Sequence, residues 1–154
     1  MAGAWLEQSL RLYTEINRAG WVAGAATYLG LTLVRCGDLA RARSLLEDSV
    51  LIAEASRDED GVAQALEGLA SLAAAQDRSQ RSVRLCAIAA DVRPRLGIPV
   101  PAWDRQWLDA VLASAGAAWS DLLSDGSCLA LPMGDVVQCA LERDGEPARR
   151  EHRA

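Results

Sequence analysis

The sequence predicts an all-α protein, organised as a helical-hairpin solenoid with a helical C-terminal cap. Just over half of the 154 residues are apolar, and the chain contains no Phe and only two Tyr. A set dominated by Ala and Leu favours closely packed helices over a sheet-built core. The sequence also repeats itself at an interval of about forty residues. Such an interval is typical of solenoids, whose units bury their apolar faces by stacking on their neighbours.

The repeat becomes visible when the sequence is shifted by forty positions against itself. Two full repeats are then predicted at residues 21–56 and 60–96, preceded by a half-repeat at residues 4–18. The shift pairs Leu6 with Leu46, Glu7 with Glu47, Ser9 with Ser49, Val22 with Val62, Ala23 with Ala63, Ala25 with Ala65, Leu29 with Leu69, Arg41 with Arg81, and Leu45 with Leu85.

Each full repeat is expected to hold two helices. In the first repeat, one helix runs from about Trp21 to Cys36 and ends at Gly37, because glycine tolerates the positive φ that is common at helix C-termini. Asp38 is then placed to cap the N-terminus of the second helix, which ends near Ser56. A polar loop and the two helices of the second repeat follow at about residues 57–61, 62–76 and 79–93.

The half-repeat at residues 4–18 aligns with the second helix of a repeat whose first helix is missing. Part of its apolar face is therefore expected to lack cover, whereas a terminal cap would be more polar. We expect either that the chain is a fragment of a longer solenoid or that a partner covers this end, and a second copy would give a homodimer through residues 4–18. The apolar residues concerned are Leu6, Leu10, Tyr13 and Ile16.

After Pro94 the repeat stops, and residues 97–143 are expected to form the helical C-terminal cap. Prolines restrict their own backbone and that of the preceding residue, so the cap is expected to begin with a stiff linker. The predicted pieces are the linker at 97–101, a helix from about Pro101 that carries Trp103 and Trp107, short helices at about 117–123 and 132–142, and a disordered tail at 144–154.

Charge and cysteine usage exclude several kinds of function. The formal net charge is −5, and apart from the short tail at 149–153 no basic cluster favours binding to nucleic acid. The four cysteines lie far apart and His152 is the only histidine, so neither a zinc site nor a disulfide framework is expected. Buried, reduced thiols are expected instead, as in a cytoplasmic protein. The cysteines are Cys36, Cys86, Cys128 and Cys139.

Other functions find no support in the sequence. The N-terminus lacks the features of a signal peptide, and the apolar window 21–34 is shorter than the roughly 20 residues that a membrane span needs. The acidic residues 58–60 lack the alternating spacing of a calcium loop and predict a solvated turn. No histidine lies near Ser120, Ser124 or Ser127, which argues against a hydrolase triad. Neither an enzymatic activity nor a metal or cofactor is expected.

The pattern of small and large residues resembles the tetratricopeptide repeat. The second repeat matches it more loosely than the first, and Pro94 stands where that pattern often closes a repeat. The matching residues are Leu29-Gly30, Gly37-Asp38-Leu39, Ala42, Leu46 and Ser49-Val50 in the first repeat, and Leu69-Ala70, Ser82, Cys86, Ala89 and Pro94 in the second.

A sharper resemblance covers most of the chain, through residues 65–70, 84–90, 96–101 and 129–132. These segments are similar to the C-terminal repeat region of large bacterial ATP-dependent regulators, including LuxR-family regulators with MalT-like repeats. The resemblance implies repeats that sense a ligand or hold a partner, beside a nucleotide-binding domain and, in the LuxR type, a DNA-binding domain. With no Lys in the sequence there is no standard phosphate loop, and too few residues follow Glu142 for a helix-turn-helix. A truncated or split member is expected.

The tetratricopeptide resemblance also implies a binding site, because the first helix of each repeat lines a concave groove in that family. The polar groove residues would be Thr27, Arg35, Gln64, Glu67 and Ser71. The alternative is that these are merely solvated positions, with Arg35 and Glu67 paired across neighbouring helices.

Trp103 and Trp107 are a further candidate, because residues four apart share a helix face. They would wall a ligand pocket or close the end of the core.

These expectations describe a non-catalytic, protein- or ligand-binding repeat module of a bacterial transcriptional regulator. Its partner or small ligand would occupy the concave groove, without direct contact to nucleic acid or a membrane. The alternative is a self-associating structural module of helical repeats.

Overall fold

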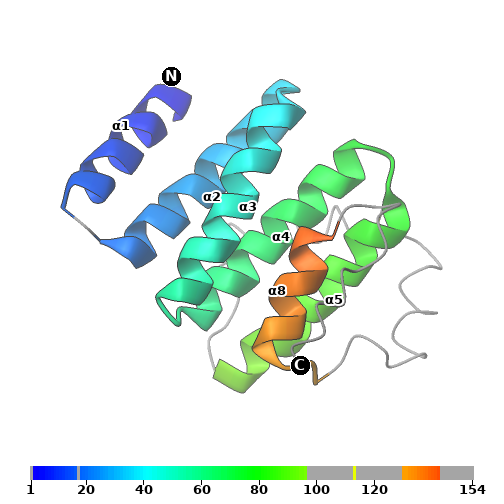
Figure 1. Cartoon of the computed structure of the whole chain (residues 1–154). Coiled ribbons are helices and arrows are strands. Elements are labelled where there is room, and N and C mark those ends of the chain that lie inside the picture. The colour runs from blue at the N-terminus through cyan, green and yellow to red at the C-terminus, as the bar shows by residue number, and fades with distance from the viewer. Residues whose placement is uncertain (1, 17, 97–112, 114–129, 143–154) are drawn as a thin grey trace, which may run out of the picture.

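The computed structural model describes residues 2–16, 18–96, 113 and 130–142, and within them all regular secondary structure is helical. The all-α prediction is therefore confirmed for this part of the chain (Figure 1). The predicted linker, the predicted helices at 101–112 and 117–123, and the predicted tail lie outside the described residues. The helices are α1 (Ala2–Glu15), α2 (Ala19–Cys36), α3 (Leu39–Ala55), α4 (Glu59–Ala75), α5 (Ser79–Leu96) and α8 (Met133–Leu141).

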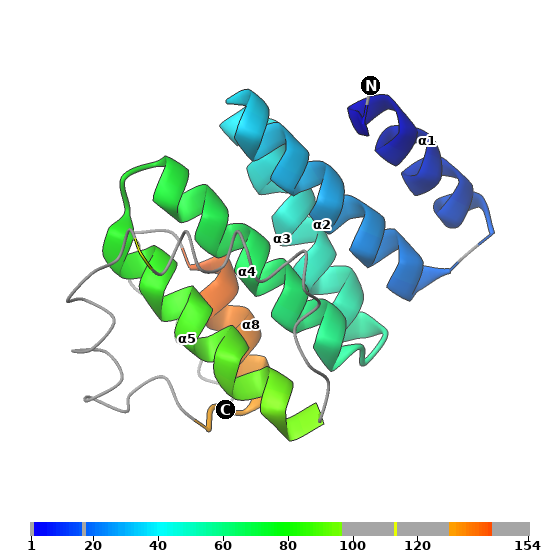
Figure 2. The same ribbon diagram turned by 180° about the vertical axis from the view of Figure 1, so that it is seen from behind.

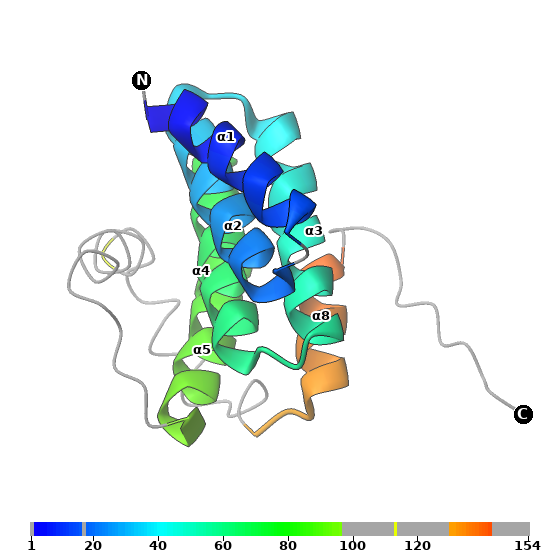
Figure 3. The ribbon, with the colours of Figure 1, turned by 90° about the vertical axis from the view of Figure 1, so that its left-hand side faces the viewer.

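The first five helices follow one another in space in the order of the chain, as the two opposite views show (Figures 1 and 2). Helix α1 packs against α2, α2 packs against α3 and α4, and α4 packs against α3 and α5. Seen from the side, α3 and α8 lie in one layer while α2, α4 and α5 lie in another (Figure 3). Helix α8 contacts α3, α4 and α5. No helix in the described residues is both long and apolar enough to cross a bilayer.

The turn between α2 and α3 forms as the sequence predicts. Gly37 has a φ of 83°, and its N–H donates to the carbonyl of Val34 at 3.1 Å. Asp38 caps α3, because its carboxylate accepts a hydrogen bond from the N–H of Arg41 at 3.3 Å. The N–H of Asp38 donates to the carbonyl of Leu33 at 3.0 Å, which satisfies a carbonyl that the helix end leaves free.

These backbone hydrogen bonds recur at a spacing of forty residues. In the turn between α4 and α5, Asp77 adopts a φ of 59° and donates to Ala74, while Arg78 donates to Ala73. The turns that lead into α2 and α4 also correspond. The matching bonds there are Arg18 to Tyr13 at 3.1 Å and Asp58 to Ala53 at 2.9 Å.

Two predicted boundaries are wrong. The acidic residues 58–60 are not a solvated turn, because Asp58 caps α4 through the N–H of Gly61 at 2.9 Å and the next two residues lie in the first turn of that helix. Acidic side chains at a helix N-terminus are stabilised by the helix dipole. Helix α5 also continues past Pro94 to Leu96, beyond the predicted end at about residue 93.

The core is centred on Leu46 of α3, which is fully buried between two glycines of neighbouring helices. A Cβ atom on Gly30 of α2 would lie 2.7 Å from Leu46 Cγ, and one on Gly68 of α4 would lie 2.5 Å from Leu46 Cδ2. The absence of side chains at both glycines therefore lets α3 approach α2 and α4 closely. The buried apolar residues of α8 that join this core are Val136, Val137 and Ala140.

The cover of α1 is partial, as the sequence predicts. Leu6, Leu10 and Tyr13 are half-buried, and the Tyr13 ring meets the Trp21 ring of α2 edge-on with centroids 5.2 Å apart. The prediction missed Trp5 and Leu12, which are exposed together with Ile16. The exposed fractions of Trp5, Leu12 and Ile16 are 70%, 50% and 61%.

Candidate functional site

The predicted groove residues lie on α2 and α4, and only some of them reach the surface. Gln64 is half-buried, and its side-chain amide donates to the hydroxyl of Tyr28 at 2.9 Å, which links the two helices. Arg35 is exposed and Ser71 is half-buried. Each of these two residues lies seven positions beyond Tyr28 or Gln64 and therefore on the same side of its helix. We call the surface formed by Tyr28, Arg35, Gln64 and Ser71 the α2–α4 face.

Thr27 does not belong to this face, contrary to the prediction. Its side chain is fully buried, and its hydroxyl lies 2.6 Å from the hydroxyl of Ser49 on α3. Ser49 has a single hydroxyl proton, which it donates to the carbonyl of Ala23 at 2.8 Å. Thr27 is therefore the donor to Ser49, and both hydroxyls join α2 to α3 inside the core.

Glu67 is also buried, with 2% of its surface exposed, so it cannot contact a ligand on the α2–α4 face. Its two carboxylate oxygens accept hydrogen bonds from Nε and Nη2 of Arg93 on α5, at 2.6 and 2.7 Å. Arg93 Nη1 also donates to Asp60 at 2.7 Å. The proposed pairing of Glu67 with Arg35 is therefore wrong, because the buried guanidinium of Arg93 occupies both carboxylate oxygens.

The cysteines agree only in part with the expectation of buried thiols. Cys86 is buried, Cys139 is half-buried and Cys36 is exposed, and none of the three forms a disulfide. Burial and then the negative charge of Glu67 raise the pKa of Cys86 from 9.0 to about 12. Its thiol is therefore protonated and unreactive at neutral pH. Cys128 lies outside the described residues, as do Trp103 and Trp107.

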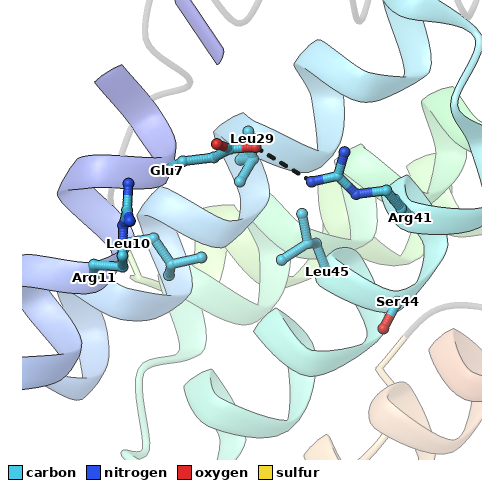
Figure 4. A pocket seen from close by; sticks show the side chains of 7 residues that line it. All are labelled: Glu7, Leu10, Arg11, Leu29, Arg41, Ser44 and Leu45. Atoms are coloured by element: carbon cyan, nitrogen blue, oxygen red, sulfur yellow. Dashed lines mark hydrogen bonds and ion pairs between the residues drawn. The ribbon is translucent and has the colours of Figure 1, made fainter. Parts of the chain in front are cut away.

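A second site, which the sequence analysis missed, opens between α1, α2 and α3 (Figure 4). We call this cavity of about 530 Å³ the α1–α3 groove. Leucines from all three helices form its apolar part, and charged side chains surround them. Glu7 accepts a hydrogen bond from Arg41 at 3.2 Å across the groove, an exposed ion pair that contributes little stability. The lining residues are Glu7, Leu10, Arg11, Leu29, Arg41, Ser44 and Leu45.

The repeat in the sequence contained a signal for this groove. Leu29, Arg41 and Leu45 were matched with equivalents forty positions later, but the sequence does not tell which copy of a repeated surface is covered. Within the described residues, α8 covers the second copy, and the first copy is the α1–α3 groove.

Neither site has the composition of a metal centre. Among the described residues, no cluster of three or more His, Cys, Asp or Glu side chains is arranged to hold a metal ion.

Comparison with known proteins identifies no relative. No protein-family model matches the chain, and no curated protein or solved structure matches it significantly.

Proposed function

We propose that this chain is a non-catalytic binding module of the tetratricopeptide type, which holds a protein partner on its α2–α4 face. The observation that carries this proposal is the recurrence of helix-end hydrogen bonds at forty-residue spacing, since it supports a stack of equivalent helical hairpins. In such a stack the first helices of successive repeats form a continuous surface. Helices α2 and α4 are these first helices, and they contact each other.

The α2–α4 face offers groups that suit an extended peptide. The amide of Gln64 and the hydroxyl of Ser71 can exchange hydrogen bonds with peptide N–H and C=O groups. The exposed guanidinium of Arg35 supplies a positive charge for a carboxylate of the partner. A peptide with an acidic residue near one end would therefore use these three side chains.

The resemblance to bacterial regulators adds a setting for this module. We place it in the cytoplasm as the sensor or partner-binding part of a transcriptional regulator, where occupation of the face would bias the arrangement of neighbouring domains. This setting predicts that the same or an adjacent reading frame encodes a nucleotide-binding ATPase domain. A gene with no such neighbour would contradict the regulator setting but not the binding role.

A peptide-display selection on the full chain tests the binding role. We expect enriched peptides whose affinity falls about tenfold when Arg35→Ala and Gln64→Ala are combined, because charge-assisted and neutral hydrogen bonds are both lost. Gln138→Ala on α8 is the matched control, since it removes an exposed glutamine away from the face. A selection that yields no binder, or binders that tolerate the double substitution, would show that the α2–α4 face is not the binding surface.

Self-association is a second candidate, favoured by the uncovered stripe of α1. Trp5, Leu12 and Ile16 are separated by seven and four positions and therefore share one side of the helix. Two copies of this stripe facing each other would form a two-fold dimer. We expect a dimer in sedimentation equilibrium that is lost when Leu12→Gln and Ile16→Gln are combined. A monomer throughout the micromolar range would exclude this candidate.

A further inference from the structure

The packing of α8 on the second repeat indicates which kind of ligand fits the α1–α3 groove of the first repeat. Helix α8 packs against α3, α4 and α5. It buries the aliphatic side chains Val136, Val137 and Ala140 there. The surface formed by α3, α4 and α5 thus binds a short amphipathic helix that does not belong to the row of repeats.

Helix α5 holds both ends of α8 by charged side chains. Arg81 Nη2 donates to the carbonyl of Ala140 in the last turn of α8, at 3.0 Å. Near the other end, the carboxylate of Asp91 accepts a hydrogen bond from the N–H of Ala130 at 3.0 Å. A cation at the C-terminal carbonyls and an anion near the N-terminus both match the helix dipole. The groove therefore fixes the direction of the helix, antiparallel to α5.

The α1–α3 groove repeats part of this construction one repeat earlier, since Arg81 has an equivalent arginine there whereas Asp91 is replaced by Leu51. Helices α1, α2 and α3 correspond to α3, α4 and α5 after a shift of forty positions. Arg41 then corresponds to Arg81, the residue that binds the C-terminal end of α8, and Leu45 corresponds to Leu85. In the first groove, however, the space beside Arg41 is an open cavity of about 530 Å³.

Arg41 is available for a new partner. Its side chain is 60% exposed, and its contacts are with the half-exposed carboxylates of Glu7 and Asp38, at 3.2 and 3.6 Å. Because solvent screens such pairs, turning the guanidinium toward a helix carbonyl costs little. Arg11 on the opposite wall has no carboxylate partner among the described residues and adds a second positive charge.

We infer that the α1–α3 groove binds a short amphipathic helix of a partner protein, seated as α8 is seated in the next repeat. The C-terminal carbonyls of that helix lie at Arg41, its small aliphatic side chains pack on Leu10, Leu29 and Leu45, and an acidic side chain faces Arg11. Helix α8 has 9 residues, so a helix seated in the same way has two to three turns. A second copy's α8 is not the occupant, because Arg81 and Asp91 already hold it in its own chain.

This inference does not rest on the proposed function, because the α1–α3 groove and the α2–α4 face share no residue. A peptide bound at one surface would leave the side chains of the other unchanged. The two proposals can therefore fail separately.

The test uses a side-chain-stapled helical peptide with the sequence of residues 130–142, added to the full chain with labelled methyl groups. We expect saturable NMR shifts at Leu10, Leu29 and Leu45, and none at Leu85 or Val137. Arg41→Gln should weaken binding about tenfold, because a hydrogen bond to a charged group is lost.

Matched variants on α3 separate the groove from the rest of that helix. Leu45→Gln should abolish the shifts, whereas Ala40→Gln, at an exposed position of α3 whose equivalent Gln80 stays exposed with α8 in place, should leave them unchanged. Circular dichroism confirms that both variants fold. No saturable binding, shifts confined to Leu85 and Val137, or shifts that appear with chain concentration in the absence of peptide would each overturn the inference.

Discussion

At the scale of single residues, Arg93 is the centre of a charged cluster that lies largely inside the core. Its guanidinium joins α5 to α4 through two hydrogen bonds to Glu67 and one to Asp60. The side chains of Arg93 and Glu67 are 4% and 2% exposed, whereas that of Asp60 is 40% exposed. Both carboxylates bind the same arginine, but Glu67 does so in the core and Asp60 near the solvent. Their contributions to the free energy of unfolding should therefore differ.

Replacement of Glu67 by Ala should lower the free energy of unfolding by about 3–5 kcal/mol, because it leaves the buried charge of Arg93 without its bidentate partner. Asp60→Ala is the control and should cost less than about 1 kcal/mol, since water screens that pair. Combining Glu67→Leu with Arg93→Met should recover most of the loss, because no buried charge remains. Urea denaturation measures all four substitutions. Equal costs for the two alanine variants would refute this account.

Cys86 gives the molecule a specific response to alkaline pH. Its pKa is about 12 in the folded chain and 9.0 when exposed. Between these values the unfolded chain loses a proton that the folded chain keeps, so the free energy of unfolding should fall by about 1 kcal/mol per pH unit. This stabilisation is present in full below pH 9 and lost as the pH approaches 12.

Urea denaturation from pH 7 to 11 checks this response. The fall in the free energy of unfolding with pH that Cys86 causes should vanish in Cys86→Ala. It should persist in Cys36→Ala, because the thiol of Cys36 is exposed in the native protein. Thiol labelling at neutral pH should modify Cys36 quickly and Cys86 only through unfolding. Rapid labelling of both residues would contradict the burial of Cys86.

At the scale of helices, the close packing of α3 against α4 depends on Gly68. We expect Gly68→Ala to destabilise the protein by about 1–3 kcal/mol, because the new methyl group would lie 2.5 Å from Leu46 Cδ2. In a Leu46→Ala background the same change should become neutral or stabilising, since alanine is the better helix former by about 1 kcal/mol. Thermal denaturation of the four combinations measures the coupling.

Gly134→Ala in α8 is the matched control for Gly68, because nothing lies within 4 Å of a Cβ atom at that position. It should stabilise α8 slightly in either background. If Gly68→Ala behaved like Gly134→Ala in the wild-type background, the proposed close approach of α3 and α4 would be wrong.

The helices and their turns could be predicted from the sequence because their signals are local. Gly37 and Asp38 determine one turn through atoms within five residues of themselves. The burial of Thr27 and Glu67 could not be predicted, because it depends on partners 22 and 26 positions away on the next helix. In a solenoid, the spacing of residues along one helix does not tell whether a given position is exposed or is covered by the neighbouring helix.

At the scale of the whole molecule, the helices differ in how much of their surface is covered. Helix α1 packs on α2 and is joined to α3 by the exposed Glu7–Arg41 ion pair, whereas α4 packs on α2, α3, α5 and α8. Local opening is easiest where the fewest contacts must break. We expect backbone amides of α1 to exchange fastest in hydrogen-exchange mass spectrometry and those of α4 slowest. Strong protection of α1 at high concentration and not at low concentration would instead indicate the dimer.

The long-range attachment of α8 also leads to an expectation about the order of folding. Helices α1 to α5 pack on the next one or two helices along the chain, whereas the bond between Arg81 and Ala140 spans 59 positions. Contacts between distant residues form slowly, because a long loop must close before they contribute stability. We therefore expect the row of helices α1 to α5 to form before α8 packs onto it.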